Sequence, residues 1–422
     1  MKTTYFLIPI VILLFSQTTK IQEKKTVSIN DQIDERLPVF PGRKEFDIYG
    51  GYKCIKGTPT GRFHLEFIND RHFLITPEGH GFISIGVTHT AAIKRTKHQK
   101  IDYLNEICDG DWDVANQKLS KQFQTWGYNS LGYDSPISTR TIYPYFASCH
   151  PTGKVSMWLR SKVKHPDVFS DEWKQEATQS IRKMMSRVEN EDNLIGIYWT
   201  DMPSWDLKIA KRSVGKTWVD AIRELPENAP GKMRYKQYKN KLGANATDEG
   251  FMVIIAKEVY AHIGPVTREL APNALIFGER YAGRALPWDI IQEALPWIDV
   301  ISVQPSGAEF PKENFDRLYR ESGKPIMICD HNSSFNTPQY NNVMWKTLSS
   351  VAEVGKAHQK YLITGFETPY LIGYNKCQYI DRFKPVVGQL KQGLIQSNGK
   401  PYHDLVELVS QNNWMVHSKF QE

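Results

Sequence analysis

Residues 193–206 read NLIGIYWTDMPSWD, and this stretch decides the fold. Apolar residues run from Leu194 to Trp199, and the run stops at Asp201, just before Pro203. A short continuous apolar run bounded by turn residues is typical of a strand buried on both faces of a parallel sheet. The stretch therefore predicts a strand that delivers a carboxylate to the rim of a pocket.

The same pattern recurs along the chain, as an apolar run with a polar or aromatic residue at its C-terminal end, followed by a helix-like segment. Eight such runs are expected, near residues 82–87, 128–133, 141–147, 194–199, 274–277, 298–303, 325–329 and 361–366. Strands that alternate with helices indicate a parallel sheet. We therefore expect an α/β fold, a (β/α)8 TIM barrel, with a short N-terminal β-hairpin over residues 61–76 that closes its base.

The N-terminus predicts export. Residues 1–20, MKTTYFLIPIVILLFSQTTK, place Lys2 before an apolar run that is too short to span a bilayer, as in a secretory signal peptide. We expect a secreted or periplasmic protein, with an uncleaved anchor as the alternative. Residues 21–49 are polar and are expected to form a linker, and residues 50–415 the barrel domain. A barrel often uses this much chain as one domain.

Several classes of protein are disfavoured by composition and motifs. The 53 basic and 46 acidic residues include no basic block long enough to bind nucleic acid. The five cysteines are widely spaced, without a CxxC pair, and there is no HExxH motif, so we expect neither a metal nor a cofactor. No GxSxG motif is present, which argues against an esterase. The richness in aromatic residues, including 11 Trp, suits a cleft that binds sugars.

Carboxylates at the expected strand ends indicate hydrolysis of a glycosidic bond. This reaction needs one carboxylic acid to protonate the leaving oxygen and a second carboxylate to attack the sugar or activate water. In a barrel both come from the C-terminal ends of the strands. Asp201, after strand four, is the predicted general acid/base, and Asp330, after strand seven, is the predicted nucleophile or base. Glu279 and Glu367 are the alternative catalytic residues.

Other polar and aromatic residues near the strand ends are candidates for substrate binding. Trp199 and Trp205 are also expected to desolvate Asp201 and so raise its pKa. The set of expected substrate-binding residues is His89, Asn129, Trp199, Trp205, Arg280, Tyr281, Gln304, His331 and Tyr370. Trp158 and Arg160 lie in the long loop 152–169 that is expected to shape the cleft.

Seven segments, in this order, resemble the agarase-like clan-A glycoside hydrolases, the group that includes the β-agarases of glycoside hydrolase family 50. The segments are GRFHLEFINDRHFLITPEGHGFISIGV (61–87), PDVFSDEW (166–173), IGIYWTDMPSWD (195–206), FGERYAG (277–283), VISVQP (300–305), GKPIMICDHNSSF (323–335) and QYIDRFKPVVGQLKQGLI (378–395). The resemblance implies a (β/α)8 barrel that cleaves β-galactosidic linkages in algal galactans, with retention of configuration.

The resemblance also implies a catalytic pair of glutamates, whereas the matching positions here are Asp201 and Asp330. Agarose, porphyran and carrageenan are therefore all retained as expected substrates, and the basic segment 207–245 would suit a sulfated galactan. The alternative is a carbohydrate-binding barrel that keeps the aromatic residues and has lost the acid pair.

Overall fold

The computed structural model describes residues 37–94, 102–188, 191–283, 286–337, 343, 347–382 and 391–421. The predicted signal peptide and the first part of the predicted linker lie outside these ranges. Residues 37–49, which were also expected in the linker, instead belong to the domain, where Val39, Phe40 and Phe46 are buried. In the described part of the chain, we find no helix with the length and apolar character needed to cross a membrane.

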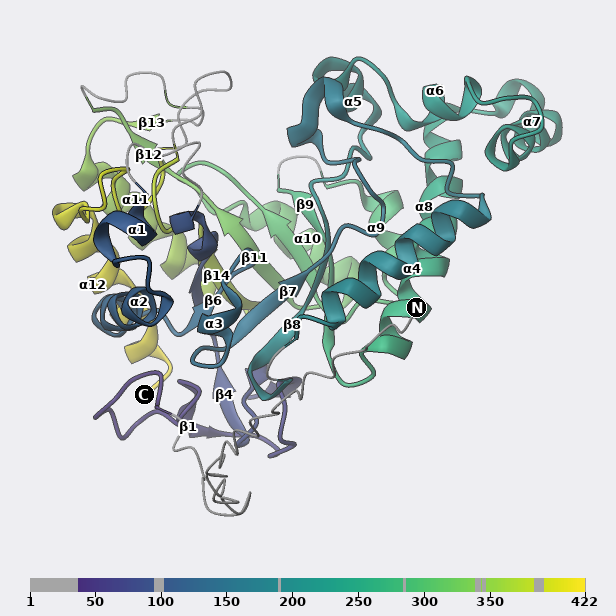
Figure 1. The fold of residues 1–422 in the computed structure, drawn as a ribbon. Helices are drawn as coiled ribbons and strands as arrows, with labels where there is room; N and C mark the ends of the chain where they lie inside the picture. Colours follow the sequence, from purple (N-terminus) through teal and green to yellow (C-terminus); the bar gives the residue numbers. More distant parts are fainter. Residues whose placement is uncertain are drawn as a thin grey trace, which may run out of the picture. The chain divides into compact units, whose positions relative to one another are not determined.

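Eight parallel strands close into a barrel (Figure 1). Around the barrel the order is β10, β11, β14, β5, β6, β7, β8, β9. The strands are β5 (Ser84–Val87), β6 (Ser130–Leu131), β7 (Tyr145–Ser148), β8 (Leu194–Asp201), β9 (Leu275–Ala282), β10 (Ile301–Gln304), β11 (Ile326–His331) and β14 (Leu371–Lys376). The predicted (β/α)8 barrel is confirmed.

Side chains fill the inside of the barrel. Phe146, Tyr198 and Phe277 contact one another through their rings, and Met327 and Cys329 belong to the same buried cluster. The interior is thus a packed core, as is usual for this fold, and a site must be built above it at the ends of the strands.

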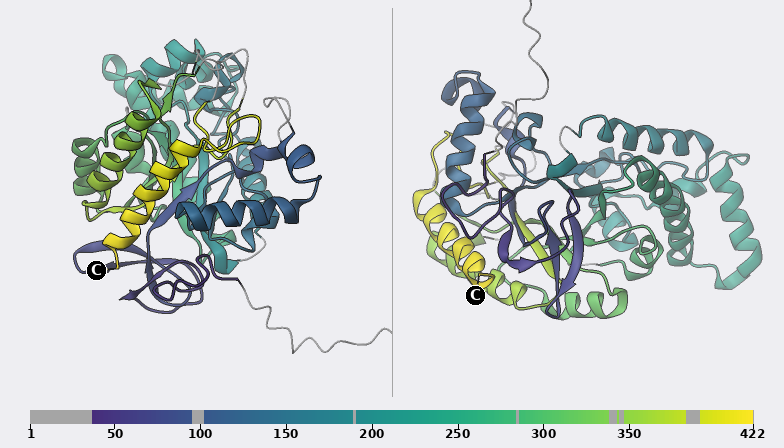
Figure 2. Two further views of the ribbon diagram at one scale, coloured as in Figure 1. Left: turned by 90° about the vertical axis from the view of Figure 1, so that its left-hand side faces the viewer. Right: turned by 90° about the horizontal axis from the view of Figure 1, so that it is seen from below.

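Helices surround the barrel. They are α1 (Tyr103–Ile107), α2 (Trp112–Trp126), α3 (Ile137–Arg140), α4 (Asp171–Met185), α5 (Leu207–Val214), α6 (Trp218–Arg223), α7 (Pro230–Leu242), α8 (Asp248–Leu270), α9 (Trp288–Ala294), α10 (Lys312–Ser322), α11 (Val351–Phe366) and α12 (His403–Lys419). Asp111, Ser170 and Thr247 cap α2, α4 and α8 with their side chains, which determines where these three helices begin. The last helix, α12, packs against α11 and α2 (Figure 2).

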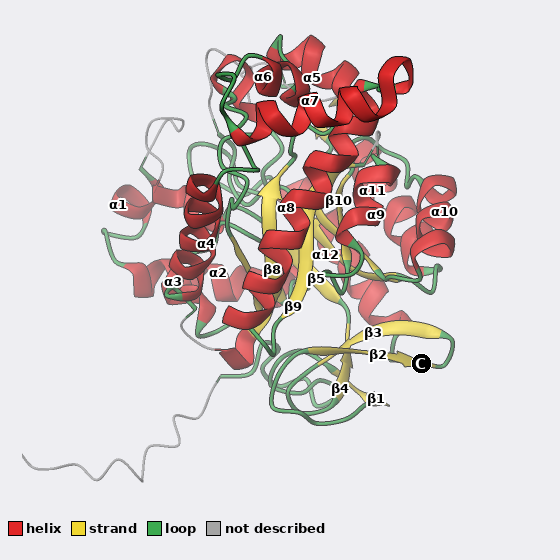
Figure 3. Cartoon of the chain, turned by 90° about the vertical axis from the view of Figure 1, so that its right-hand side faces the viewer, coloured by secondary structure: helices red, strands yellow, loops and turns green. Residues whose placement is uncertain are grey.

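The expected hairpin is part of a four-stranded antiparallel sheet at the base of the barrel (Figure 3). Its strands are β1 (Tyr52–Lys56), β2 (His64–Ile68), β3 (Arg71–Ile75) and β4 (His80–Phe82). The guanidinium of Arg71 donates to the carbonyl oxygens of Phe366, Thr368 and Leu371, at the entrance to β14. The sheet therefore covers the N-terminal ends of the strands.

The prediction of strand eight was wrong. Residues 361–366 are the last turns of α11, and the eighth strand is β14, ten residues later in the chain. The apolar residues of this segment face the barrel from a helix, since Tyr361, Leu362 and Phe366 are buried together with Val354. A small two-stranded sheet, β12 (Ser334–Phe335) with β13 (Thr347–Leu348), lies outside the barrel.

The segment 207–245 forms α5, α6 and α7, which lie at the end of the barrel opposite to the basal sheet (Figure 3). Tyr235 and Tyr238 of α7 pack their rings on Phe251 of α8, with centroids 4.9 and 5.4 Å away. The insertion is thus anchored on the helix that follows it, beside the functional end of the barrel.

Candidate functional site

Asp201 lies at the C-terminal end of β8, where the apolar part of the strand is over. The seven residues before it are buried, and Asp201 is the first that water reaches, with 21% of its side chain exposed. Gln304, at the end of β10, donates a hydrogen bond of 2.6 Å from Nε2 to Oδ1 of Asp201. The same oxygen lies 3.7 Å from a guanidinium nitrogen of Arg280. Asp201, Gln304 and Arg280 therefore lie together at the C-terminal end of the barrel.

Asp330, on β11, occupies a more enclosed position. Only 7% of the residue is exposed, and the hydroxyl of Tyr133 donates a hydrogen bond to its Oδ2. Burial raises the pKa of Asp330, and the negative charge of Asp201 acts in the same direction. The two aspartates are therefore close enough to influence each other electrostatically, at the same end of the barrel.

Arg280 connects the two acids. It is buried, its guanidinium carbon lies 3.5 Å from the ring centroid of Tyr133, and it faces Asp201. Burial opposes its positive charge, but the attraction of Asp201 and of other acidic groups, including Asp330, raises the pKa of Arg280 further. A permanent cation thus lies within electrostatic reach of both carboxylates.

A bulge in β9 determines that Arg280, and not Glu279, faces the barrel. Phe277 packs inside the barrel, so in a regular strand Glu279 would point inward as well. Gly278 adopts a positive φ of 67°, and the pairing of β8 with β9 shifts its register in this region. Glu279 consequently points outward, toward Tyr260 of α8.

Glu279 lies in a closed polar pocket outside the barrel. Its Oε2 accepts hydrogen bonds of 2.5 Å from Trp205 Nε1 and 2.6 Å from the hydroxyl of Tyr260. Complete burial raises the pKa of Glu279 to about 7, although both hydrogen bonds oppose that rise. Because it points away from Asp201 and Asp330, Glu279 is not part of their site.

Glu367 and Tyr370 are at the wrong end of the barrel for a role in this site. Glu367 is the C-cap of α11, and Tyr370 precedes the first residue of β14. The hydroxyl of Tyr370 donates to Asp316 of α10, 2.7 Å away. Glu367 was expected to be catalytic and Tyr370 to bind substrate only because residues 361–366 were predicted to be strand eight.

The predicted aromatic platforms are buried against the helices. Trp199 donates a hydrogen bond of 3.1 Å to Thr267 of α8, and Trp205 stacks on Trp218 of α6. Tyr281 is also buried, beside Tyr260. Both tryptophans consequently lie beside Tyr260, the tyrosine that binds Glu279. Trp158, in the 3-10 helix Met157–Lys162, is 41% exposed.

Asn129 and His331 have structural contacts. Asn129 donates to the carbonyl of Ile83 and accepts from the amide of Ile85, which ties β5 to its neighbour near the base. The ring of His331 stacks on Tyr361, and its nitrogens lie 2.8 Å from the hydroxyl of Tyr374 and from the carbonyl of Gly307. Neither side chain reaches the two aspartates.

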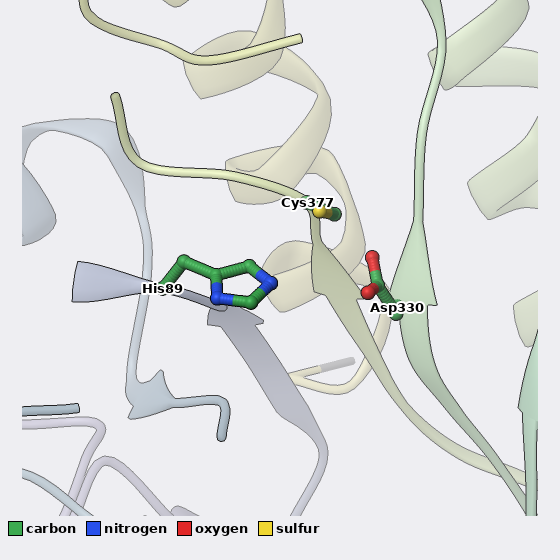
Figure 4. A group of neighbouring side chains, drawn as sticks. All are labelled: His89, Asp330 and Cys377. Atoms are coloured by element: carbon green, nitrogen blue, oxygen red, sulfur yellow. The ribbon is translucent and has the colours of Figure 1, made fainter. Parts of the chain in front are cut away.

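His89 lies at the rim of the barrel, as expected, and two of its neighbours there are Asp134 and Cys377. Its Nδ1 is 2.6 Å from Asp134 Oδ2. The ring points toward Asp330 and Cys377, the residue that follows β14 (Figure 4). Cys377 is not among the predicted site residues, because the predicted strand eight lies ten residues before β14. All five cysteines, each within the described ranges, are free thiols.

The fold is similar to those of several solved structures, one of them an exo-beta-agarase. An exo-beta-agarase superposes with a TM-score of 0.74 over 91% of this chain and 68% of that chain, at 16% identity. PfGH50B gives 0.72 over 90% of this chain and 70% of that chain, also at 16% identity. BpGH50 gives 0.68 over 89% and 86%, at 20% identity. No family model and no curated protein matches the sequence. At these identities the likeness establishes the fold.

Proposed function

We propose that the protein is a glycoside hydrolase that acts on β-galactosidic linkages of agar-type galactans, with Asp201 and Asp330 as the two catalytic carboxylates. The observation that carries this proposal is the arrangement of both acids around Arg280 at the C-terminal end of the barrel. Active sites of this fold lie at that end, and glycoside hydrolysis needs such a pair. The likeness to an exo-beta-agarase supports the substrate class.

The surroundings of the two acids suggest their roles. Asp330 suits the nucleophile, because the hydroxyl of Tyr133 fixes one carboxyl oxygen while Oδ1 has no hydrogen-bond partner among the described residues. Asp201 suits the acid/base, because this group must exchange its proton with water in every cycle and its side chain is partly exposed. Gln304 would hold Asp201 in position and share its amide with a sugar hydroxyl.

A sulfated galactan fits the charge of the insertion. The segment 207–245 carries ten basic and three acidic residues, an excess equal to the net charge of +7 of the whole chain. Lys232 and Lys236 pair with Glu227, while Arg234, Lys239 and Lys241 of the same helix are exposed to solvent. We propose that these cations bind sulfate groups of a polysaccharide that extends from the catalytic site.

The test is product analysis on agarose, porphyran and carrageenans, with Asp201→Asn and Asp330→Asn as variants. Both variants should lose at least about 100-fold in kcat, the lower limit for removal of a general acid or base. Glu367→Gln is the matched control, because this acid lies at the base of the barrel and should leave the rate unchanged. The anomer first released, observed by NMR, reports retention or inversion.

The outcomes separate catalysis from binding. Full activity in either Asn variant would contradict the assignment of that residue. If the wild-type protein binds one of the polysaccharides without cleaving it, the proposal fails in favour of a carbohydrate-binding barrel.

We also propose export to the periplasm or the medium, on the basis of residues 1–20. Fractionation of cells that express the full chain tests this, and recovery of the protein in the cytoplasm alone would contradict it.

A further inference from the structure

Three side chains of different chemistry converge beside the mouth of the barrel (Figure 4). His89, Asp330 and Cys377 each offer one ligand atom, and these atoms all lie within 4.8 Å of one another. They come from the ends of β5, β11 and β14, which are neighbours in the barrel. The topology alone therefore brings a nitrogen, an oxygen and a sulfur ligand together, although 288 residues separate the first from the last.

The oxygen ligand, Oδ1 of Asp330, is the atom of the three that lacks a hydrogen-bond partner within the described part of the chain. Oδ1 of Asp330 is buried, and among the described residues no hydrogen bond to it is found, while Oδ2 is bound by Tyr133. A buried carboxyl oxygen without a partner is unfavourable. The thiol of Cys377 is the group next to it.

The nitrogen ligand is already oriented. Nδ1 of His89 lies 2.6 Å from the carboxylate of Asp134, and the other ring nitrogen, Nε2, is on the side of the ring that faces Asp330. A histidine that binds a metal ion usually has its second nitrogen held by a carboxylate in this way. In Figure 4 the ring of His89 points toward Asp330 and Cys377.

The sulfur ligand is protonated when no cation is present, because burial and the adjacent Asp330 carboxyl raise the pKa of the Cys377 thiol. Gln392 Nε2 donates a hydrogen bond of 2.9 Å to this sulfur. Arg280 and Lys376 lie nearby and oppose an additional positive charge, whereas Asp201 favours it. A thiolate formed on binding would offset that repulsion.

A second acidic cluster provides a contrast. Asp47, Glu78 and His80 also lie within 4.8 Å of one another, but both oxygens of Asp47 are already used. They accept hydrogen bonds from the amides of Tyr49 and Gly51 and from the hydroxyl of Thr76. This cluster holds the basal sheet together, and no buried side-chain atom of its three residues lacks a hydrogen-bond partner.

We propose that His89, Asp330 and Cys377 form a site for one divalent cation of the zinc class, with the fourth position open to the mouth of the barrel. Mixed nitrogen, oxygen and sulfur ligands suit such ions. Ligand distances of about 2.0–2.3 Å require the side chains to close in slightly on binding. The Cys377 S–H bond breaks, a sulfur–metal bond forms, and the proton passes to solvent.

The cation takes Oδ1 of Asp330, the same atom that would attack the sugar. The ion and the substrate therefore exclude each other, and this consequence rests on the proposed glycosidase function. The binding site itself does not depend on that function.

Titration of the purified full-length protein with Co²⁺, under anaerobic conditions and with a non-thiol reductant, tests the site. The wild type should bind one equivalent and develop the near-ultraviolet absorption of a cobalt–thiolate bond. Cys377→Ser should lose this absorption, whereas Cys108→Ser, the matched buried control, should keep it. Asp134→Asn should weaken the affinity by about 10–100-fold, the usual effect of removing a carboxylate that orients a ligating histidine.

Each result decides the proposal. Absence of the thiolate absorption from the wild type, or its persistence in Cys377→Ser, overturns the site. Circular dichroism shows that each variant is folded. Zn²⁺ should displace cobalt. Bound Zn²⁺ should also raise the apparent KM of hydrolysis, and addition of a chelator should return the KM to its value without zinc. Hydrolysis that is unaffected by bound zinc overturns only the exclusion of substrate, and absence of any hydrolysis contradicts only the proposed function.

Discussion

The guanidinium of Arg280 lies over the ring of Tyr133, with 3.5 Å between its central carbon and the ring centroid. The same guanidinium faces Asp201, and the hydroxyl of the same tyrosine binds Asp330. One buried cation and one phenol thus organise both acids. A charged group in this position is stable only because its partners are present.

Arg280→Met should destabilise the protein by about 3–5 kcal/mol, because it leaves buried acids without their cation. Urea denaturation at neutral pH measures the change. Arg268→Met is the control, since Arg268 and Asp299 form a partly exposed pair near the base, and its loss should cost at most about 1 kcal/mol. Equal losses in the two variants would contradict a special role for Arg280.

Tyr133→Phe should move the acidic limb of the kcat/KM profile to higher pH. The hydroxyl of Tyr133 lowers the pKa of Asp330, whose net pKa is raised by burial. As nucleophile, Asp330 must be ionised, so activity falls as the pH drops through its pKa. Removal of the Tyr133 hydroxyl raises that pKa, and the loss of activity therefore begins at a higher pH. Tyr319→Phe, at the base of the barrel, should leave the profile unchanged. A limb that moves to lower pH would contradict this reasoning.

Glu279→Gln should stabilise the protein above neutral pH. The pKa of Glu279 is raised from 4.5 to about 7 in the folded protein, so folding favours its neutral form. This contribution is complete below pH 4.5 and is lost as the pH rises through about 7, amounting to about 3 kcal/mol between these limits. Thermal unfolding from pH 5 to 9 should show a weaker decline for Glu279→Gln than for the wild type. Parallel curves would show that Glu279 does not titrate in this range.

Gly278→Ala should destabilise the protein more than Gly323→Ala. Both glycines have positive φ, 67° and 65°, and an alanine there costs about 1–2 kcal/mol. At Gly278 the added methyl would also lie 2.9 Å from Ile298, whereas at Gly323 it meets nothing within 4 Å. Gly278→Ala should in addition lower activity, because the bulge positions Arg280. Chemical denaturation and kcat/KM measure the two effects, and identical values for both variants would contradict the role of the bulge.

The sequence predicts the barrel because its periodic signals are local, as in the run from Leu194 to Asp201. It misplaces strand eight because YLITGF reads equally well as a short buried strand or as the end of a helix. The true strand, LIGYNK, ends in polar residues that are nevertheless buried. The spacing of apolar residues cannot show that the polar residues Asn375 and Lys376 are buried.

The site shows a related limit. Asp201, Asp330, Arg280 and Gln304 are predicted because each follows an apolar run, and they do converge. The orientation of Glu279 could not be predicted, because one bulge at Gly278 reverses the alternation of faces after it. The place of Cys377 beside His89 and Asp330 could not be predicted from the sequence. These three residues are brought together by the order of β5, β14 and β11 in the barrel, and not by their spacing along the chain.

The contacts of Arg71 at the entrance to β14 have a consequence for synthesis. Its guanidinium binds the carbonyl of Leu371, 300 residues later in the chain. Until that segment leaves the ribosome, β5 and β11 each present an unpaired edge, and the basal sheet lacks the carbonyl groups to which Arg71 donates. Open edges of this kind pair readily with other chains. The nascent protein therefore depends on being kept apart from its neighbours until the last strand of the barrel emerges.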